Sequence, residues 1–130
     1  MRGKLSLLAA LLLLVAMSLV ACGGSDSEQA AEAGKSLFEQ TTIGTTAGCK
    51  TCHSLEAGTV IVGPSLAGIA TRAATTVPDL SAEEYLRQSI LEPDTYLVKE
   101  YPASIMPNVW AKQLSEEQVD QLIAYLLTIK

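Results

Sequence analysis

Five residues near the middle of the chain, Cys49-Lys50-Thr51-Cys52-His53, constrain its fold more than any other stretch. Two cysteines separated by two residues and followed at once by histidine have the spacing of c-type haem attachment. The spacing has a physical reason, because two thiols three positions apart can each form a thioether with one of the vinyl groups along one haem edge. The histidine then meets the iron from the same side. The motif therefore predicts one covalently bound haem c on Cys49 and Cys52, with His53 on the iron.

The ligand on the opposite face of the iron decides between electron transfer and chemistry on a bound molecule. His53 is the only histidine, so a second imidazole is impossible. Met1 and Met17 fall in a segment that we expect to be removed, which leaves Met106 as the only methionine of the mature protein. A methionine in a loop is usually a gap-filler in a core. Met106, however, precedes Pro107, and a rigid backbone of this kind can aim a thioether at the iron.

Residues 1–21 have the pattern of a bacterial export signal rather than of a folded segment. Arg2 and Lys4 precede an uncharged, leucine-dominated run that ends at Ala21. Small residues before Cys22 resemble the lipobox of lipoproteins, in which the cysteine is lipidated and becomes the first residue. The alternative is an uncleaved anchor, although the run is short for a bilayer of about 30 Å. Either way we expect a domain on the periplasmic face of the membrane.

The cysteines and the charges are then accounted for. Cys22 takes lipid while Cys49 and Cys52 take haem, so no disulfide is predicted. Residues 22–28 are small, polar and acidic and predict a flexible linker, and residues 29–130 predict one domain. Removing two basic residues with the signal leaves 9 − 2 = 7 Lys and Arg against 14 Asp and Glu. This acidic balance excludes nucleic acid as a partner.

Two amphipathic helices are predicted at the ends of the domain. The first covers residues 28–40 and has Gly34 and Phe38 on one face. The last follows a capping box of Ser115 and Gln118 and carries an apolar stripe over residues 119–126. A glycine inside a helix costs about 1 kcal/mol relative to alanine. We therefore expect Gly34 where the last helix approaches closely.

Between these helices, shorter elements surround the motif. Residues 41–48 are rich in Thr and Gly and predict a loop. Residues 66–74 predict a short helix, and a capping box at Ser81 predicts another, which Pro93 stops. Residues 92–110 contain three prolines and predict an extended loop.

Two further residues are candidates for roles near the haem. A histidine that ligates a metal usually donates its other ring N–H to a carbonyl, and the turn at Gly63-Pro64 makes the Pro64 carbonyl our candidate acceptor from His53. The alternative is a proline that simply ends a loop. Arg72 is either a solvated surface charge or a partner for a haem propionate, and the sequence does not separate the two.

Taken in order, four stretches resemble a class I mono-haem cytochrome c over nearly all of the mature domain: Cys49 to His53, Gly63-Pro64-Ser65-Leu66, Tyr96 to Met106-Pro107, and the closing helix Leu122 to Leu126. The resemblance implies an all-α fold around one covalent haem, with the N- and C-terminal helices crossing. It also implies that His53 and Met106 are the axial ligands and that the Pro64 carbonyl faces His53. Gly34 and Phe38 are then expected to cross the last helix near Tyr125.

The resemblance implies an electron carrier and not an enzyme, with redox proteins as partners and no small-molecule substrate. The stretch from Glu92 to Tyr96, followed by Tyr101-Pro102, is similar to cytochrome c domains of membrane respiratory complexes, including caa3-type oxidases. A lipid-tethered subunit with a single haem is similar to one in alternative complex III. We therefore expect transfer from a quinol-oxidising complex to a terminal oxidase, a reaction centre or a soluble carrier.

Three rival classes are less consistent with the sequence. A structural zinc site needs four ligands, and the mature chain offers only Cys49, Cys52 and His53 among Cys and His donors. A thioredoxin-like dithiol needs a βαβ pattern, and no parallel strands are visible. A haem sensor or peroxidase-like protein needs a displaceable distal ligand. That last class is the main alternative, and a bound Met106 argues against it.

Overall fold

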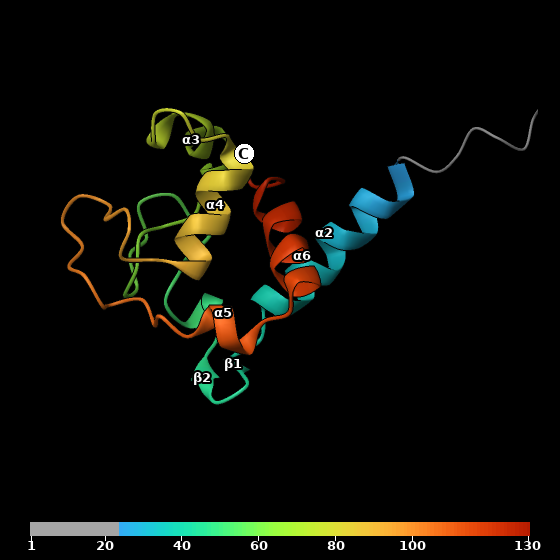
Figure 1. The fold of residues 1–130 in the computed structure, drawn as a ribbon, viewed down its shortest axis with the longest axis horizontal. Coiled ribbons are helices and arrows are strands. Elements are labelled where there is room, and N and C mark those ends of the chain that lie inside the picture. The colour runs from blue at the N-terminus through green and yellow to red at the C-terminus, as the bar shows by residue number, and fades with distance from the viewer. Residues whose placement is uncertain (1–23) are drawn as a thin grey trace, which may run out of the picture.

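A computed structural model describes residues 24–130, which form five α-helices and one short two-stranded sheet at the edge of the domain (Figure 1). The predicted signal and Cys22 lie outside the described residues. The elements in chain order are α2 (Gly24–Phe38), β1 (Thr42–Ile43), β2 (Thr46–Ala47), the 3-10 helix η2 (Cys49–Thr51), α3 (Ile69–Thr76), α4 (Ala82–Leu91), α5 (Trp110–Gln113) and α6 (Glu116–Leu126). Helices dominate, which confirms the predicted all-α class.

The first and last helices cross, and this is the most extensive contact between elements (Figure 1). A Cβ atom on Gly34 would lie 1.8 Å from the Gln121 carbonyl oxygen, so only glycine allows the two backbones to approach so closely. One turn later, the Phe38 and Tyr125 rings lie 5.5 Å apart between centroids. The predicted crossing at Gly34 and Phe38 is confirmed.

Both predicted capping boxes are present. Ser81 caps α4 with Glu84, and Ser115 caps α6 with Gln118. Each serine hydroxyl accepts a backbone N–H of the first turn, and each long side chain accepts the backbone N–H of its serine, so donors otherwise left without partners are satisfied. The α6 stripe is buried, with Val119, Leu122, Ile123, Tyr125 and Leu126 in the core. Helix α4 ends at Leu91, two residues before Pro93, as predicted.

The predicted linker is wrong over most of its length. Residues 22–28 were expected to be irregular, but α2 begins at Gly24. Asp26 lies in the first turn, where a negative charge interacts favourably with the positive end of the helix dipole. Residues 26–29 are exposed, so the early turns of α2 bury no face. They extend a helix whose later turns pack on α6. Sequence periodicity detects only the packed part.

Three smaller elements also differ from expectation. The loop over residues 41–48 contains the antiparallel pair β1 and β2, in which Thr42 faces Ala47. Helix α3 begins at Ile69 instead of Leu66, because Gly68 has a left-handed backbone with φ +68° and cannot be part of a right-handed helix. The predicted loop over residues 92–110 ends in the short helix α5, which begins at Trp110. None of these changes the class of the fold.

We expect Gly34→Ala to lower the free energy of unfolding by about 1–3 kcal/mol, the cost typical of overpacking. Helix propensity alone predicts the opposite, a gain of about 1 kcal/mol. The added methyl group would meet the Gln121 carbonyl and push α2 away from α6. Denaturant unfolding of the haem-loaded protein measures the difference. Ser36→Ala, at an exposed position of the same helix, is the matched control and should be neutral or slightly stabilising. A Gly34→Ala protein as stable as its parent would contradict the proposed packing.

Candidate functional site

The first three residues of the haem-attachment motif form the 3-10 helix η2, which begins one residue after the end of β2. The Thr51 hydroxyl donates to the Gly48 carbonyl at 2.6 Å, and the His53 amide donates to the Cys49 carbonyl at 3.0 Å. These bonds wind the five residues tightly enough for Cys49, Cys52 and His53 to border one cavity. The sequence motif is therefore also a spatial cluster.

The imidazole of His53 is oriented through its second nitrogen. Nδ1 lies 2.9 Å from the Pro64 carbonyl oxygen, so the hydrogen bond predicted from the sequence is present. With Nδ1–H as the donor, Nε2 is left with a free lone pair. Burial lowers the pKa of His53, and the Pro64 carbonyl opposes this only in part, so the ring is neutral and able to bind a metal.

The turn that carries Pro64 fits closely around the ring. The Val62 and Gly63 amides both donate to the Cys52 carbonyl, at 3.2 and 2.9 Å. A Cβ atom on Gly63 would lie 2.5 Å from the His53 Cε1 atom and 2.9 Å from Nδ1. The backbone therefore packs directly against one side of the imidazole. Gly63 and Pro64 together determine the position and the tautomer of His53.

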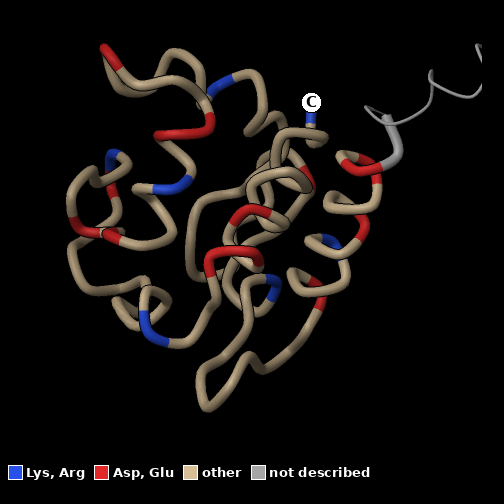
Figure 2. Tube along the Cα trace, turned by 45° about the vertical axis from the view of Figure 1, so that its right-hand side comes forward, with Lys and Arg blue, Asp and Glu red and all other residues tan. Residues whose placement is uncertain are grey.

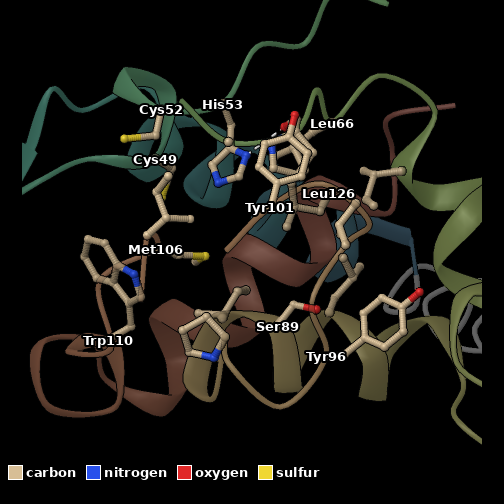
Figure 3. Close-up of a pocket in the computed structure, with 18 of the residues that line it drawn as sticks. Cys49, Cys52, His53, Leu66, Ser89, Tyr96, Tyr101, Met106, Trp110 and Leu126 are labelled. Carbon is tan, nitrogen blue, oxygen red and sulfur yellow. Dashed lines mark hydrogen bonds between the residues drawn. The ribbon is translucent and has the colours of Figure 1, made fainter. Parts of the chain in front are cut away.

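Met106 enters the same cavity from the long loop between α4 and α5. Its side chain is half-buried against the core and lines the cavity together with Cys49, Cys52 and His53. Figure 3 shows the Met106 thioether and the His53 ring directed into one space from different parts of the chain. About fifty residues separate Met106 from His53 in sequence, and the fold brings them to one pocket.

The cavity has a volume of about 490 Å³, within the usual range of roughly 300–1,000 Å³ for small-molecule and cofactor sites. Its wall is mainly apolar and comes from the turn after the motif, from α3, α4 and α6, and from the loop that carries Met106. A covalent haem requires two thiols, a neutral imidazole and apolar surroundings, and a thioether can serve as its second axial ligand. The cavity wall contains all of these groups. The residues present fit this group.

The Cys49 thiol does not suit dithiol exchange. Burial raises the pKa of the Cys49 thiol to about 11, so it is protonated at neutral pH. Dithiol exchange uses the thiolate. In the described part of the chain, no group of three or more His, Cys, Asp or Glu residues is arranged to hold a metal ion. Thioether formation with a haem uses both sulfurs without leaving a charge.

Arg72 lies at the cavity wall, but its guanidinium is already engaged. It donates to the Ala67 carbonyl and, at 3.0 Å, to the Ser65 carbonyl. A guanidinium has five N–H donors, so these bonds leave donors available to an anion. The side chain is exposed. Both interpretations of the sequence, surface charge and propionate partner, remain compatible with this position, and the second stays a prediction.

Sequence reasoning missed Trp110 as a site residue. It is the only tryptophan of the chain, it is 4% exposed, and it lines the cavity beside Met106. Its Nε1–H is buried without a hydrogen-bond partner among residues 24–130, which is uncommon for a buried donor. The available signal was its position four residues after Met106. Tyr96 was likewise missed as a cavity residue, and its ring makes an edge contact with Tyr85 at 5.8 Å.

The sequence matches the Cytochrome c family over residues 31–130, which include every cavity residue described above. The chain belongs to the cytochrome c family. Similar proteins include cytochrome c2 iso-2 of Magnetospirillum molischianum, which is 36% identical over 88 residues, 63% of this chain and 91% of that protein. Cytochrome c2 iso-2 of Magnetospirillum fulvum is 36% identical over 87 residues, 62% of this chain and 91% of that protein.

Membership explains what the site is for. The cofactor of this cytochrome c is covalent haem c, and the protein is an electron carrier rather than an enzyme. The haem supplies the redox-active iron. The chain contributes the attachment turn, an oriented neutral imidazole and an apolar enclosure that excludes water.

For this cytochrome c we expect Gly63→Ala to raise the reduction potential and to lower stability by about 1–3 kcal/mol. The new methyl group would displace the His53 ring and weaken its bond to Pro64. A histidine that loses this bond is a less basic ligand and stabilises ferric iron less. Redox titration and denaturant unfolding measure the two effects.

Gly58→Ala is the matched control for this experiment. The backbone φ of Gly58 is +75°, so alanine is strained at this position, but nothing lies within 4 Å of the added Cβ. It should lower stability without moving the potential. Equal potentials for Gly63→Ala and its parent would contradict a role of this turn in orienting His53.

Proposed function

We propose that this cytochrome c transfers single electrons through a haem whose iron is bound by His53 and Met106. The observation that carries the proposal is that four residues line one cavity, Cys49 and Cys52 of the motif together with His53 and Met106. His53 is the only histidine of the chain, and Met106 is the only methionine among the described residues. Among residues 24–130, no second histidine or second methionine is available to complete the pair.

This ligand pair explains why the site would serve electron transfer. When both axial positions are held, ferrous and ferric iron keep nearly the same geometry, so an electron enters or leaves with little rearrangement. Methionine ligation raises the reduction potential. The apolar wall adds to this, because it disfavours the more highly charged ferric state. A haem sensor or peroxidase-like protein, in which an external molecule displaces Met106, is the alternative that the following experiment separates.

Met106→Ala should abolish the weak sulfur-to-iron absorption band of the ferric protein and lower its potential. It should also open the iron to external ligands such as imidazole or azide. Visible spectroscopy and redox titration of the purified protein measure these effects. Asn108→Ala changes an exposed side chain two residues after Met106 that does not line the cavity, and it is the matched control. If the band survives in Met106→Ala, Met106 is not a ligand of the iron. A parent protein that binds azide as readily as this variant would favour the sensor.

We propose further that the protein is exported and held at the periplasmic face of the membrane by lipid on Cys22. Cys22 lies outside the described residues, so the proposal rests on the sequence. In the part of the chain that the structure describes, no helix is both long and apolar enough to cross a membrane. Because α2 begins at Gly24, two residues after Cys22, the spacer between lipid and domain is helical rather than flexible. A helical spacer limits how far the haem can move from its anchor.

The proposed partners are redox proteins of the same membrane, a quinol-oxidising complex as donor and a terminal oxidase, reaction centre or soluble carrier as acceptor. All 14 Asp and Glu residues of the chain lie in the described domain, against 7 Lys and Arg, and the acidic positions are spread along the described trace (Figure 2). A partner that met this surface broadly would need a basic or neutral face.

Cys22→Ser should release the protein from the membrane into the soluble periplasmic fraction and abolish incorporation of labelled fatty acid. Haem content and spectrum should not change, because the anchor is remote from the cavity. Cell fractionation and metabolic labelling in an expressing bacterium measure both. A parent protein that incorporates no labelled fatty acid and keeps its signal would instead establish an N-terminal hydrophobic anchor.

A further inference from the structure

We propose that Asp94 is a positioning residue for the iron ligand Met106, acting through a clamp on Ser104. The proposal rests on the ligation by Met106 proposed above. Asp94 lies near the start of the loop that carries Met106, and Ser104 lies two residues before Met106, so their contact ties the backbone next to Met106 to the start of the loop. The clamp would keep the thioether at the iron and exclude competing ligands.

The clamp consists of two hydrogen bonds to one carboxylate. The backbone N–H of Ser104 donates to Asp94 Oδ1 at 2.7 Å, and its hydroxyl donates to Oδ2 at 3.3 Å. The first is short, as expected when the acceptor carries a charge. Bonds of this kind are roughly twice as strong as those between neutral groups. Ser104 is therefore tied to Asp94 at its backbone, and Met106 follows only two residues later.

Asp94 is itself attached to the rigid part of the domain. It follows Pro93, which is buried directly after α4. Helix α4 buries Tyr85, Leu86 and Ile90 in the core. The carboxylate thus projects from the end of a fixed helix, and it also lies at the cavity wall. A bond to Asp94 transmits the position of α4 to Ser104, two residues before Met106.

The loop has little else to hold it in place. Residues 95–105 are mostly exposed and contain no helix or strand. Within these residues, the other side-chain hydrogen bond is local, from the Thr95 hydroxyl to Glu92 at 3.3 Å. Tyr96 contacts Tyr85 by its ring, but this lies in the first half of the loop. In the described structure, the clamp is thus the side-chain hydrogen bonding that joins the backbone near Met106 to the residues that follow α4.

The backbone at Ser104 also requires a restraint. Its φ is +62°, a left-handed conformation that is uncommon for a residue other than glycine. Such conformations persist where surrounding contacts stabilise them, and they are concentrated at functional sites. Here the contact is the Asp94 carboxylate. Without it, residues 104–106 would relax toward ordinary backbone angles, and the direction of the Met106 side chain would change.

The test is the affinity of the ferric, haem-loaded protein for imidazole, together with the sulfur-to-iron band. An external ligand binds only when Met106 is off the iron, so its apparent affinity reports the population of that state. Asp94→Ala should raise imidazole affinity by about tenfold, since a hydrogen bond to a charged group typically contributes that much. Asp94→Asn keeps an acceptor for the Ser104 N–H and should give a smaller increase.

Two control variants complete the series. Glu92→Ala removes a neighbouring exposed carboxylate that contacts only Thr95 and should leave imidazole affinity unchanged. Ser104→Ala removes only the longer of the two bonds and should raise the affinity slightly. If Asp94→Ala does not fold, Asp94→Asn and Ser104→Ala decide the question.

The proposal is overturned if Asp94→Ala and Asp94→Asn lower the denaturant midpoint but leave imidazole affinity and the band at parent values. That result would give Asp94 a structural role only. Met106→Ala in the same titration separates this failure from failure of the ligation. If Met106→Ala binds imidazole strongly while the Asp94 variants match the parent, Met106 binds the iron and the clamp does not help to hold it there. If Met106→Ala also matches the parent, the ligation is wrong and the clamp proposal fails with it.

Discussion

The apolar cavity is the feature on which the rest of the structure depends. Its wall is mainly apolar, and apolar surface gains about 25 cal/mol for each Å² that is removed from water. A large apolar group that fills the 490 Å³ between the helices therefore stabilises the fold. Haem is therefore part of the core of this cytochrome c as well as its redox centre.

This dependence explains why small backbone details matter at the site. The direct packing of Gly63 on His53 and the bond from Pro64 fix one side of the pocket. The close approach of α2 and α6 at Gly34 fixes how these two helices pack, and both of them contribute side chains to the cavity wall. Both are places where a single methyl group has no room. The loop that carries Met106 is the exception, since it is exposed and held by few bonds.

Much of this was predictable because its causes are local in sequence. Residue spacing alone predicted the turn of Cys49 to His53, the two capping boxes and the stripe on α6. The glycine at residue 34, inside a predicted helix, implied a close neighbour. The bond from Pro64 to His53 was inferred from the chemistry of metal-bound histidine, and it is present in the structure.

The remaining features depend on tertiary contacts that spacing does not encode. The exposed early turns of α2 have no apolar period, so they were taken for a linker. Trp110 could not be recognised as a cavity residue, because its burial results from the packing of α5 against a loop distant in sequence. The bonds between Asp94 and Ser104 join residues ten apart through a left-handed backbone that no residue type there indicates.

The central claim is that the iron of this electron carrier is held between His53 and Met106. X-ray absorption at the iron edge of the unaltered protein tests it most directly, because sulfur and nitrogen scatter differently. The account predicts a single sulfur ligand beside nitrogen ligands in both the ferric and the ferrous states, with little change in bond lengths between them. An iron that has only nitrogen or oxygen ligands, or that loses its sulfur ligand on oxidation, would contradict it.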